Sequence, residues 1–290
     1  MAKGRELKGR IKSVENTRKI TRTMEMVATS KMKRATDRVA AARPYALALG
    51  EMLRHVYAPE LAEDFPLLRR PAVQRRVALL VLTANRGLCG AFNSNLIKEA
   101  RTRIAELEAK GAAVELHIVG KKGIGFFRYT GRPIASQNTD ITDRPSAQDA
   151  AMLVDGLMAR FASGELDAVY VTATKFRSAL STPPATDMVL PVTPPTPAAG
   201  ATAPATRDFI LSPSPKDILE ALLPAYVRNA VYRALVETEA GFQSAQRTAM
   251  KNATDNATEM LQTLKRTYNT ARQAQITQEI AEIVGGAAAL

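Results

Sequence analysis

Two long stretches at the ends of this 290-residue chain lack the residues that interrupt helices. Residues 10–43 contain neither Gly nor Pro, and residues 225–284 contain no Pro and a single Gly, Gly241. Both stretches are far longer than the average globular helix of about 11–12 residues. A long helix cannot bury an apolar face by itself, so the sequence predicts that the two ends wind together as a coiled coil.

The N-terminal stretch carries a narrow apolar stripe on a basic helix. Its first three apolar residues follow the i, i+4, i+7 spacing of one helix face. The later apolar residues continue the stripe from a position displaced around the helix. We expect Pro44 to kink or end this helix, although residues 45–56 again have a helical composition. The stripe consists of Leu7, Ile11, Val14, Ile20, Met24, Val27, Met32 and Val39.

Charge is distributed unevenly along the chain. The net charge is +12, and residues 1–56 hold 14 Lys and Arg against 5 Asp and Glu, which gives +9. Residues 216–290 hold 8 of each kind and are neutral. The N-terminal arm therefore predicts an acidic partner, either nucleic acid or an acidic protein surface. The chain has no Trp and only 5% aromatic residues, a composition poorly suited to stacking on bases.

The middle of the chain alternates between short apolar runs and helical segments. Residues 77–83, 114–119 and 167–174 have the continuous apolar character of buried strands. Helices are expected over residues 93–110 and from the capping residue Ser146 to about residue 161. This order predicts a mostly parallel α/β sheet with right-handed crossovers.

Between the middle and the C-terminal stretch lies a segment of biased composition. Residues 193–206 consist only of Thr, Pro, Ala and Gly, so we expect a loop without a packed core. The flanking residues 188–192 and 209–211 have the composition of two arms of a hairpin. Ser214 and Pro215 then predict the cap and first residue of the last helix, and Pro224 is expected to bend its start.

The last helix changes character along its length. Residues 248–270 are mainly small or polar, with Met260, Leu261, Leu264 and Tyr268 as a sparse apolar seam. The tail is uncharged after Glu282 and ends in apolar residues. Such a tip is expected to enter an apolar partner surface rather than water.

Motifs for catalysis are weak. The glycine-containing segments 120–125 and 85–90 each follow a strand, but neither fits the known phosphate-binding spacings, so tight strand-to-helix turns are favoured over nucleotide sites. Cys89 has no second Cys or nearby His and is expected to be a packed thiol. A single Cys excludes an internal disulfide and suits a reducing compartment. The isolated His117 lies in a strand and is expected to be structural. We expect no catalytic residue, no cofactor, no metal site and no membrane span.

Two terminal segments carry a resemblance to a known family. Residues 11–35 (IKSVENTRKITRTMEMVATSKMKRA) closely resemble the N-terminal helix of the γ subunit of F-type ATP synthases. Residues 252–290 resemble its C-terminal helix, and the segments NRGLCGAFN at 85–93, TKFRSA at 174–179 and SPSPKDILEALLPAYV at 212–227 agree as well.

The resemblance implies a fold and a role. The fold would be an antiparallel coiled coil of the two terminal helices plus a Rossmann-like α/β domain. It would consist of an N-terminal helix over 1–56, the α/β domain over 73–192 with its loop at 193–206, and a C-terminal helix over 212–290. The role would be that of the central rotor stalk, which transmits torque between the proton-driven c-ring and the hexamer of α and β subunits without being itself an enzyme.

The resemblance also implies partners and contact residues. The partners would be the α, β and ε subunits and the c-ring, at the cytoplasmic face of a bacterial inner membrane as a peripheral protein. Met24 belongs to the family's MEMVA segment at the level where the stalk meets the β subunit. Arg272, Gln273 and Thr277 belong to its ARQ..ITQE segment, which contacts a β loop.

Departures and rival functions remain. Many relatives carry a SE..ARM-type run where this chain has residues 241–248, so the coupling contacts assigned to that region in the family are in doubt here. Asn85 stands where relatives often have Asp. The main alternative is a basic coiled-coil protein that binds nucleic acid, against which the neutral C-terminal helix argues. A small nucleotide-binding enzyme is a third interpretation.

Overall fold

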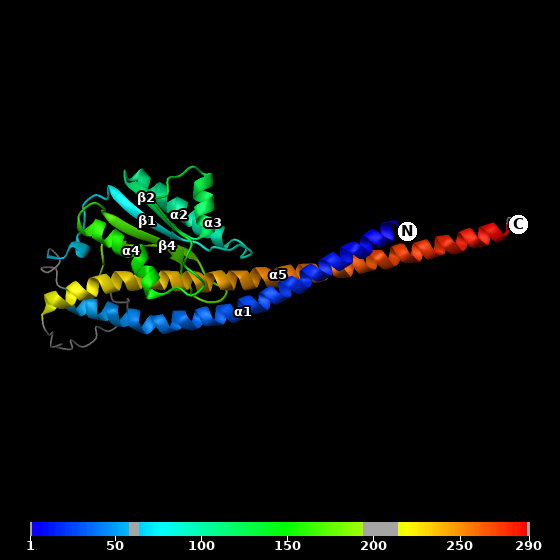
Figure 1. Ribbon diagram of the computed structural model, residues 1–290, viewed down its shortest axis with the longest axis horizontal. Coiled ribbons are helices and arrows are strands. Elements are labelled where there is room, and N and C mark those ends of the chain that lie inside the picture. The colour runs from blue at the N-terminus through cyan, green and yellow to red at the C-terminus, as the bar shows by residue number, and fades with distance from the viewer. Residues whose placement is uncertain (1, 58–63, 194–213, 289–290) are drawn as a thin grey trace. The chain divides into compact units, whose positions relative to one another are not determined.

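The computed structural model describes residues 2–57, 64–193 and 214–288 (Figure 1). These residues form two compact units, which we name the central unit, Lys31–Ala245, and the terminal unit, Met1–Ser30 with Gln246–Leu290. The elements in chain order are α1 (Ala2–Val56), η2 (Pro66–Leu68), β1 (Arg76–Leu82), α2 (Phe92–Ala109), β2 (Ala113–Val119), α3 (Lys121–Tyr129), β3 (Ser136–Asn138), α4 (Ala147–Ala162), β4 (Ala168–Thr174), β5 (Pro184–Leu190) and α5 (Pro215–Ala288).

A five-stranded sheet in the order β3-β2-β1-β4-β5 forms the middle of the central unit. The first four strands are parallel, and β5 runs antiparallel to β4. The predicted parallel α/β arrangement is therefore confirmed. The sequence analysis did not predict α3 and β3. Both follow the tight turn at Gly120, and both are short.

Successive residues of β1 point to opposite faces of the sheet, and both faces are buried. Val77, Leu79 and Val81 pack with α2 and α3. Their neighbours Ala78, Leu80 and Leu82 pack with α4, α5 and the last turns of α1. A strand with two buried faces reads as a continuous apolar run, which is why residues 77–83 were predictable.

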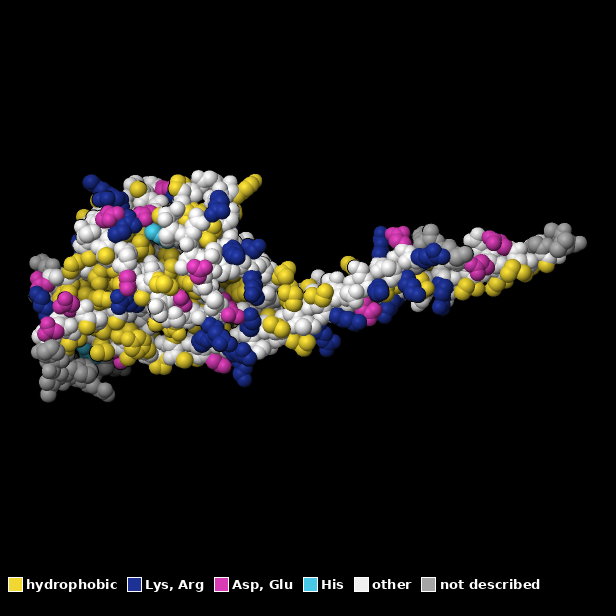
Figure 2. Space-filling view, viewed as in Figure 1, with side chains coloured by type: hydrophobic (Ala, Val, Ile, Leu, Met, Phe, Trp, Pro, Cys, Tyr) yellow, Lys and Arg dark blue, Asp and Glu magenta, His cyan; other side chains and the backbone are white. Residues whose placement is uncertain are grey.

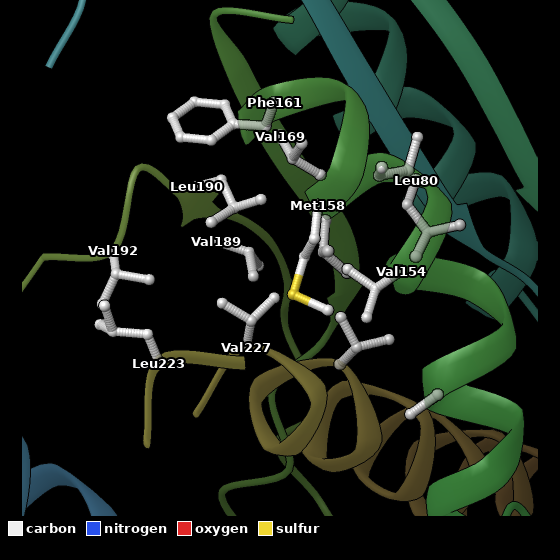
Figure 3. Packing of buried hydrophobic residues seen from close by; sticks show 14 of the residues in the cluster. Leu80, Val154, Met158, Phe161, Val169, Val189, Leu190, Val192, Leu223 and Val227 are labelled. Atoms are coloured by element: carbon white, nitrogen blue, oxygen red, sulfur yellow. The ribbon is translucent and has the colours of Figure 1, made fainter. Parts of the chain in front are cut away.

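The second face of the sheet holds the larger core (Figure 3). In this view side chains of β1, β4, β5, α4 and α5 point toward one another around Met158. The residues labelled there are Leu80, Val154, Met158, Phe161, Val169, Val189, Leu190, Val192, Leu223 and Val227. Because α5 supplies part of this core, its first turns belong to the α/β unit as well as to the helical pair.

Several expectations about helix ends are confirmed, and of the two outcomes expected at Pro44, a kink or an end, the end is not observed. Ser146 accepts a hydrogen bond from Asp149 N, and Asp149 in turn accepts one from Ser146 N, which is the expected capping box. Ser214 Oγ accepts from Asp217 N at 3.2 Å at the start of α5. Pro44 does not end α1, which runs through it to Val56. Leu49, Leu53 and Val56 are buried in the core, so packing of the last turns outweighs the lost backbone bond.

The predicted hairpin of residues 188–192 with residues 209–211 is not tested by the described residues, but its first arm also pairs with β4. Residues 188–190 belong to β5, which pairs with β4 along Thr174↔Pro184 to Val169↔Leu190. The second predicted arm, residues 209–211, and the loop residues 194–206 lie outside the described residues. Sequence reasoning missed this pairing because β5 is half exposed and contains Pro184 and Asp187.

Candidate partner-binding surface

The terminal unit is a pair of helices, α1 and α5, that run in opposite directions (Figure 1). Thr254 Oγ1 donates to Thr21 Oγ1 at 2.8 Å, a hydrogen bond between the two helices. Seven of the less exposed positions of α1 in this unit alternate in steps of three and four residues, which is the heptad of a coiled coil. They are Leu7, Ile11, Val14, Arg18, Thr21, Glu25 and Ala28, and the half-buried Glu15 and Met24 lie beside this series.

The seam of α1 corrects the predicted stripe. Ile20 and Val27 are 60% and 51% exposed, whereas Thr21 and Ala28 are buried. On α5 the buried seam includes Leu261, as predicted, but Met260 is exposed. Small side chains at the seam let two helices approach closely, so small Thr and Ala are buried and larger apolar residues point outward.

The structure places the four predicted contact residues on two levels of the helical pair. Arg272, Gln273 and Thr277 are exposed on neighbouring turns of α5, and Thr277 Oγ1 donates to Gln273 O at 3.0 Å. Met24 is half-buried on α1. Arg272 lies 18 residues beyond Thr254 on one helix, or about 27 Å at 1.5 Å per residue. Since Thr254 meets Thr21, three residues from Met24, these residues do not form one site.

Beyond these residues the C-terminal tip of α5 exposes an apolar stripe. Ile276, Ile280, Ile283 and Val284 are 47–72% exposed and follow the i, i+4, i+7, i+8 spacing of one helix face. Figure 2 shows apolar side chains along one edge of this arm. The expectation of an apolar tip is confirmed as far as Val284, and Leu290 lies outside the described residues.

The possible phosphate cradle at residues 120–125 is already filled by protein atoms. Gly120 precedes α3 with φ 97°, and a Cβ at this residue would lie 2.1 Å from Thr83 O. The first N–H groups of α3, which would bind a phosphate, are taken: Lys121 N donates to Asn85 Oδ1 at 3.0 Å and Gly123 N to Thr83 Oγ1 at 3.0 Å. The geometry therefore favours the predicted tight turn and gives Asn85 a structural role.

The thiol of Cys89 is packed rather than reactive. It is 3% exposed, and burial raises its pKa above the usual value, which disfavours the nucleophilic thiolate. Asn93 Nδ2 donates to its sulfur at 3.2 Å.

His117 belongs to a structural network at the edge of the sheet. Its Nδ1 lies 2.6 Å from Ser136 Oγ on β3, and its Nε2 lies 3.1 Å from Glu115. Arg160 donates to both oxygens of Glu115 at 2.7 Å, and this pair holds the pKa of Glu115 below its usual value. Burial lowers the pKa of His117, which favours the neutral ring.

Three residues of the run on α5 that departs from the family pattern, Gly241, Phe242 and Ser244, contact other segments of the central unit, to which they belong. A Cβ at Gly241 would lie 2.7 Å from Thr174 Cγ2, and Phe242 packs edge-on against Phe92 with ring centroids 5.8 Å apart. Ser244 Oγ donates to Ala179 O. The only signal available in the sequence was the isolated Gly within a long helix, which often marks close packing.

A small polar cluster lies next to these residues. Gln243 is 2% exposed and donates from Nε2 to Glu239 Oε1 at 2.6 Å. Burial raises the pKa of Glu239 to about 7, and the charge of Asp143 adds to the rise. Lys31 of α1 bonds Asp143 at 2.8 Å, and its charge, with that of Arg38, acts in the opposite direction on Glu239.

Two further expectations concern the described part of the chain. None of its helices has the length and apolar character required to cross a membrane. Within the same residues, no three His, Cys, Asp or Glu side chains gather in a way that suits a metal ion.

Comparison with known proteins gives a consistent result. A family model described as ATP synthase matches residues 3–290. The chain is 79% identical to the ATP synthase gamma chain of Gemmatimonas aurantiaca over 290 residues, covering 100% of this chain and 99% of that one. It is 45% identical to the gamma chain of Leptospira biflexa, with both chains covered completely.

Solved structures share the fold. A rotor chain of the Euglena gracilis mitochondrial ATP synthase aligns with TM-score 0.64 and 19% identity, covering 95% of this chain and 99% of that chain. A central stalk/c-ring structure of the Tetrahymena thermophila enzyme aligns with TM-score 0.60 and 24% identity over 81% of this chain and 99% of that chain. The nucleic-acid interpretation finds no support in these matches. The full-length matches in sequence and the coiled-coil and sheet architecture show that the chain belongs to the ATP synthase gamma-chain family.

Proposed function

We propose that this chain is the central rotor stalk of an F-type ATP synthase. In this role it transmits torque between a proton-driven c-ring and the catalytic sites of a hexamer of α and β subunits. The observation that carries the proposal is the helical pair. α1 has 55 residues and α5 has 74, and they pair over an unbroken heptad seam in the terminal unit. Long helices without breaks resist bending and twisting, which a torque-bearing element requires.

The outer surface of the pair suits a rotating element. A rotor must break its contacts with the stator at each step, so no angular position should bind too strongly. The exposed positions of α5 between residues 248 and 270 are mostly polar, and their charges nearly cancel: Lys251, Lys265 and Arg266 against Asp255 and Glu259. The apolar stripe from Ile276 to Val284 would be buried if the end of the helical pair rotated inside an apolar sleeve formed by the surrounding subunits.

We further propose that the chain is a non-catalytic subunit. Its partners would be the α and β subunits, the ε subunit and the c-ring, and it would lie as a peripheral protein at the cytoplasmic face of a bacterial inner membrane. The basic arm of α1 would face acidic segments of the β subunits. The three-part division into residues 1–56, 73–192 and 212–290 remains our working division of the chain.

Met24, Arg272, Gln273 and Thr277 are proposed to contact the β subunits. Exposed Arg272 and Gln273 offer directional hydrogen-bond donors on a helix that carries few charges nearby. In the assembled complex, Arg272→Ala and Gln273→Ala should lower ATP turnover while the free chain stays folded. Met24→Lys should add a contact with a β carboxylate and weaken proton pumping.

The decisive measurement is purification of the complex from native membranes. Co-elution of this chain with an ATPase of α and β subunits supports the proposal, and its absence from that complex refutes it. Within the complex, unchanged coupled turnover in both α5 variants would refute the assigned contacts while leaving the rotor role standing.

A further inference from the structure

Within the central unit, Gly241, Phe242 and Ser244 bring α5 into contact with three segments that are distant in sequence. Gly241 lies against Thr174 at the end of β4, and Phe242 packs on Phe92 at the start of α2. Ser244 Oγ donates to the carbonyl of Ala179 in the turn that links β4 to β5. All three contacts lie where β1 and β4 reach the carboxyl edge of the sheet, so one turn of helix is held from several directions.

Gly241 is the position where α5 approaches the sheet most closely. An added Cβ would lie 2.7 Å from Thr174 Cγ2 and 3.3 Å from Phe92 Cε2. Thr174 cannot withdraw easily, because it is 2% exposed and its N–H donates to Thr238 Oγ1 of α5 at 3.2 Å. A glycine in a helix interior costs roughly 0.5–1 kcal/mol relative to Ala, so its presence here needs a compensating contact.

The aromatic contact lies in its own small core. Phe92 and Phe242 are both nearly buried, and they pack with Cys89 and Leu96.

A single contact would act as a pivot, about which a helix is free to roll. Contacts to β4, α2 and the β4–β5 turn together resist rotation of α5 about its own axis.

We propose that Gly241–Ser244 form a joint that couples rotation of α5 to rotation of the sheet in the central unit, with Gly241 as the positioning residue. The inference rests on the proposed torque-transmitting function. α5 continues beyond this joint into the terminal unit as the same helix. The first turns of α5 are also anchored in the large core, so a loosened joint would free only the part of the helix nearest the terminal unit to twist relative to the sheet. Torque would then be transmitted less efficiently even though both units remain folded.

The test compares two glycines in α-helices of the complete complex. Gly241→Ala adds the clashing Cβ, whereas Gly156→Ala in α4 adds a Cβ that meets nothing within 4 Å. Complexes reconstituted in vesicles are assayed for ATP hydrolysis and for ATP-driven proton pumping, each per mole of complex. We expect the pumping-to-hydrolysis ratio to fall roughly fivefold or more in Gly241→Ala, the order by which overpacking with one methyl group shifts a packing equilibrium. Gly156→Ala should keep the native ratio.

A second-site substitution distinguishes a positioning role of Gly241 from a general effect on the stability of the chain. Thr174→Ser removes the Cγ2 methyl group that the new Cβ would meet, so Gly241→Ala/Thr174→Ser should recover most of the ratio. A purely structural role would lower assembly and both activities together and leave the ratio unchanged. If Gly241→Ala does not assemble, Phe242→Leu, which keeps an apolar side chain but removes the edge-on ring contact, is measured in its place.

The outcomes are distinct. An unchanged pumping-to-hydrolysis ratio in Gly241→Ala, or in Phe242→Leu if that variant is used, overturns the joint. A loss of the ratio in Gly241→Ala that the second substitution Thr174→Ser fails to repair also overturns it. Failure of the rotor function itself would look different, because the native complex would then pump protons equally well with or without this chain.

Discussion

The carboxyl group of Glu239 offers a quantitative test of the packing around α5. Burial raises its pKa from 4.5 to about 7, against the hydrogen bond from Gln243 and the charges of Lys31 and Arg38. The nearby Asp143 is paired with Lys31 at 2.8 Å, so the negative charge of Asp143 offsets part of the effect of Lys31 on Glu239. The folded chain therefore favours the neutral form of Glu239.

The direction of the pH effect follows from this raised pKa. The stability that neutral Glu239 contributes is complete below its unfolded pKa of 4.5 and is lost as the pH rises through about 7. At about 1.36 kcal/mol per pKa unit, the rise from 4.5 to about 7 corresponds to at most about 3.4 kcal/mol. Roughly 2.5 kcal/mol of it falls between pH 5 and pH 8.

Glu239→Gln removes the ionisation and keeps the shape of the side chain. We expect the variant to be more stable than the native chain by up to about 3 kcal/mol at pH 8 and by less than about 1 kcal/mol at pH 5. Urea unfolding of the full chain, followed by circular dichroism at both pH values, measures the difference. Glu220→Gln, at an exposed carboxylate of the same helix, is the matched control. A difference between Glu239→Gln and the native chain that is equal at pH 5 and pH 8 would refute the reasoning.

Three further predictions test other parts of the structure. Thr83→Val removes the hydroxyl group that fills the start of α3 and should cost about 1–3 kcal/mol of unfolding free energy, measured by urea denaturation. Leu261→Ala should lower the stability of the helical pair by about 2–4 kcal/mol, whereas Met260→Ala, at an exposed neighbour, should change it by less than about 0.5 kcal/mol in the same assay. Arg160→Met should destabilise the chain at pH 7, and the difference from the native chain should shrink as the pH falls through the lowered pKa of Glu115, as pH-dependent unfolding would show.

Much of the secondary structure was predictable because its signals are local. The strand at residues 77–83 was expected from its apolar run and lies at Arg76–Leu82. The capping box at Ser146 and the start of α5 at Ser214 depend on residues three apart in the sequence, and both are present. The long helices were expected from the absence of helix-breaking residues.

Other features could not be read from local patterns. β5 is half exposed and carries a proline, so only its pairing with β4 identifies it as a strand. The cited contacts of Gly241, Phe242 and Ser244 come from residues 65 or more positions away in sequence. A single sequence does not reveal such partners.

The amino-acid sequence alone determined that this chain has two long terminal helices around a parallel α/β middle, because helix breakers, apolar runs and caps act over a few residues. Its terminal motifs also pointed to the right family. Only the tertiary structure decided which stripe of α1 is buried: Thr21 and Ala28 rather than Ile20 and Val27. The reason is physical. Both stripes have the correct spacing, and the choice between them depends on how closely the second helix can approach, which small side chains permit and a list of hydrophobic residues does not reveal.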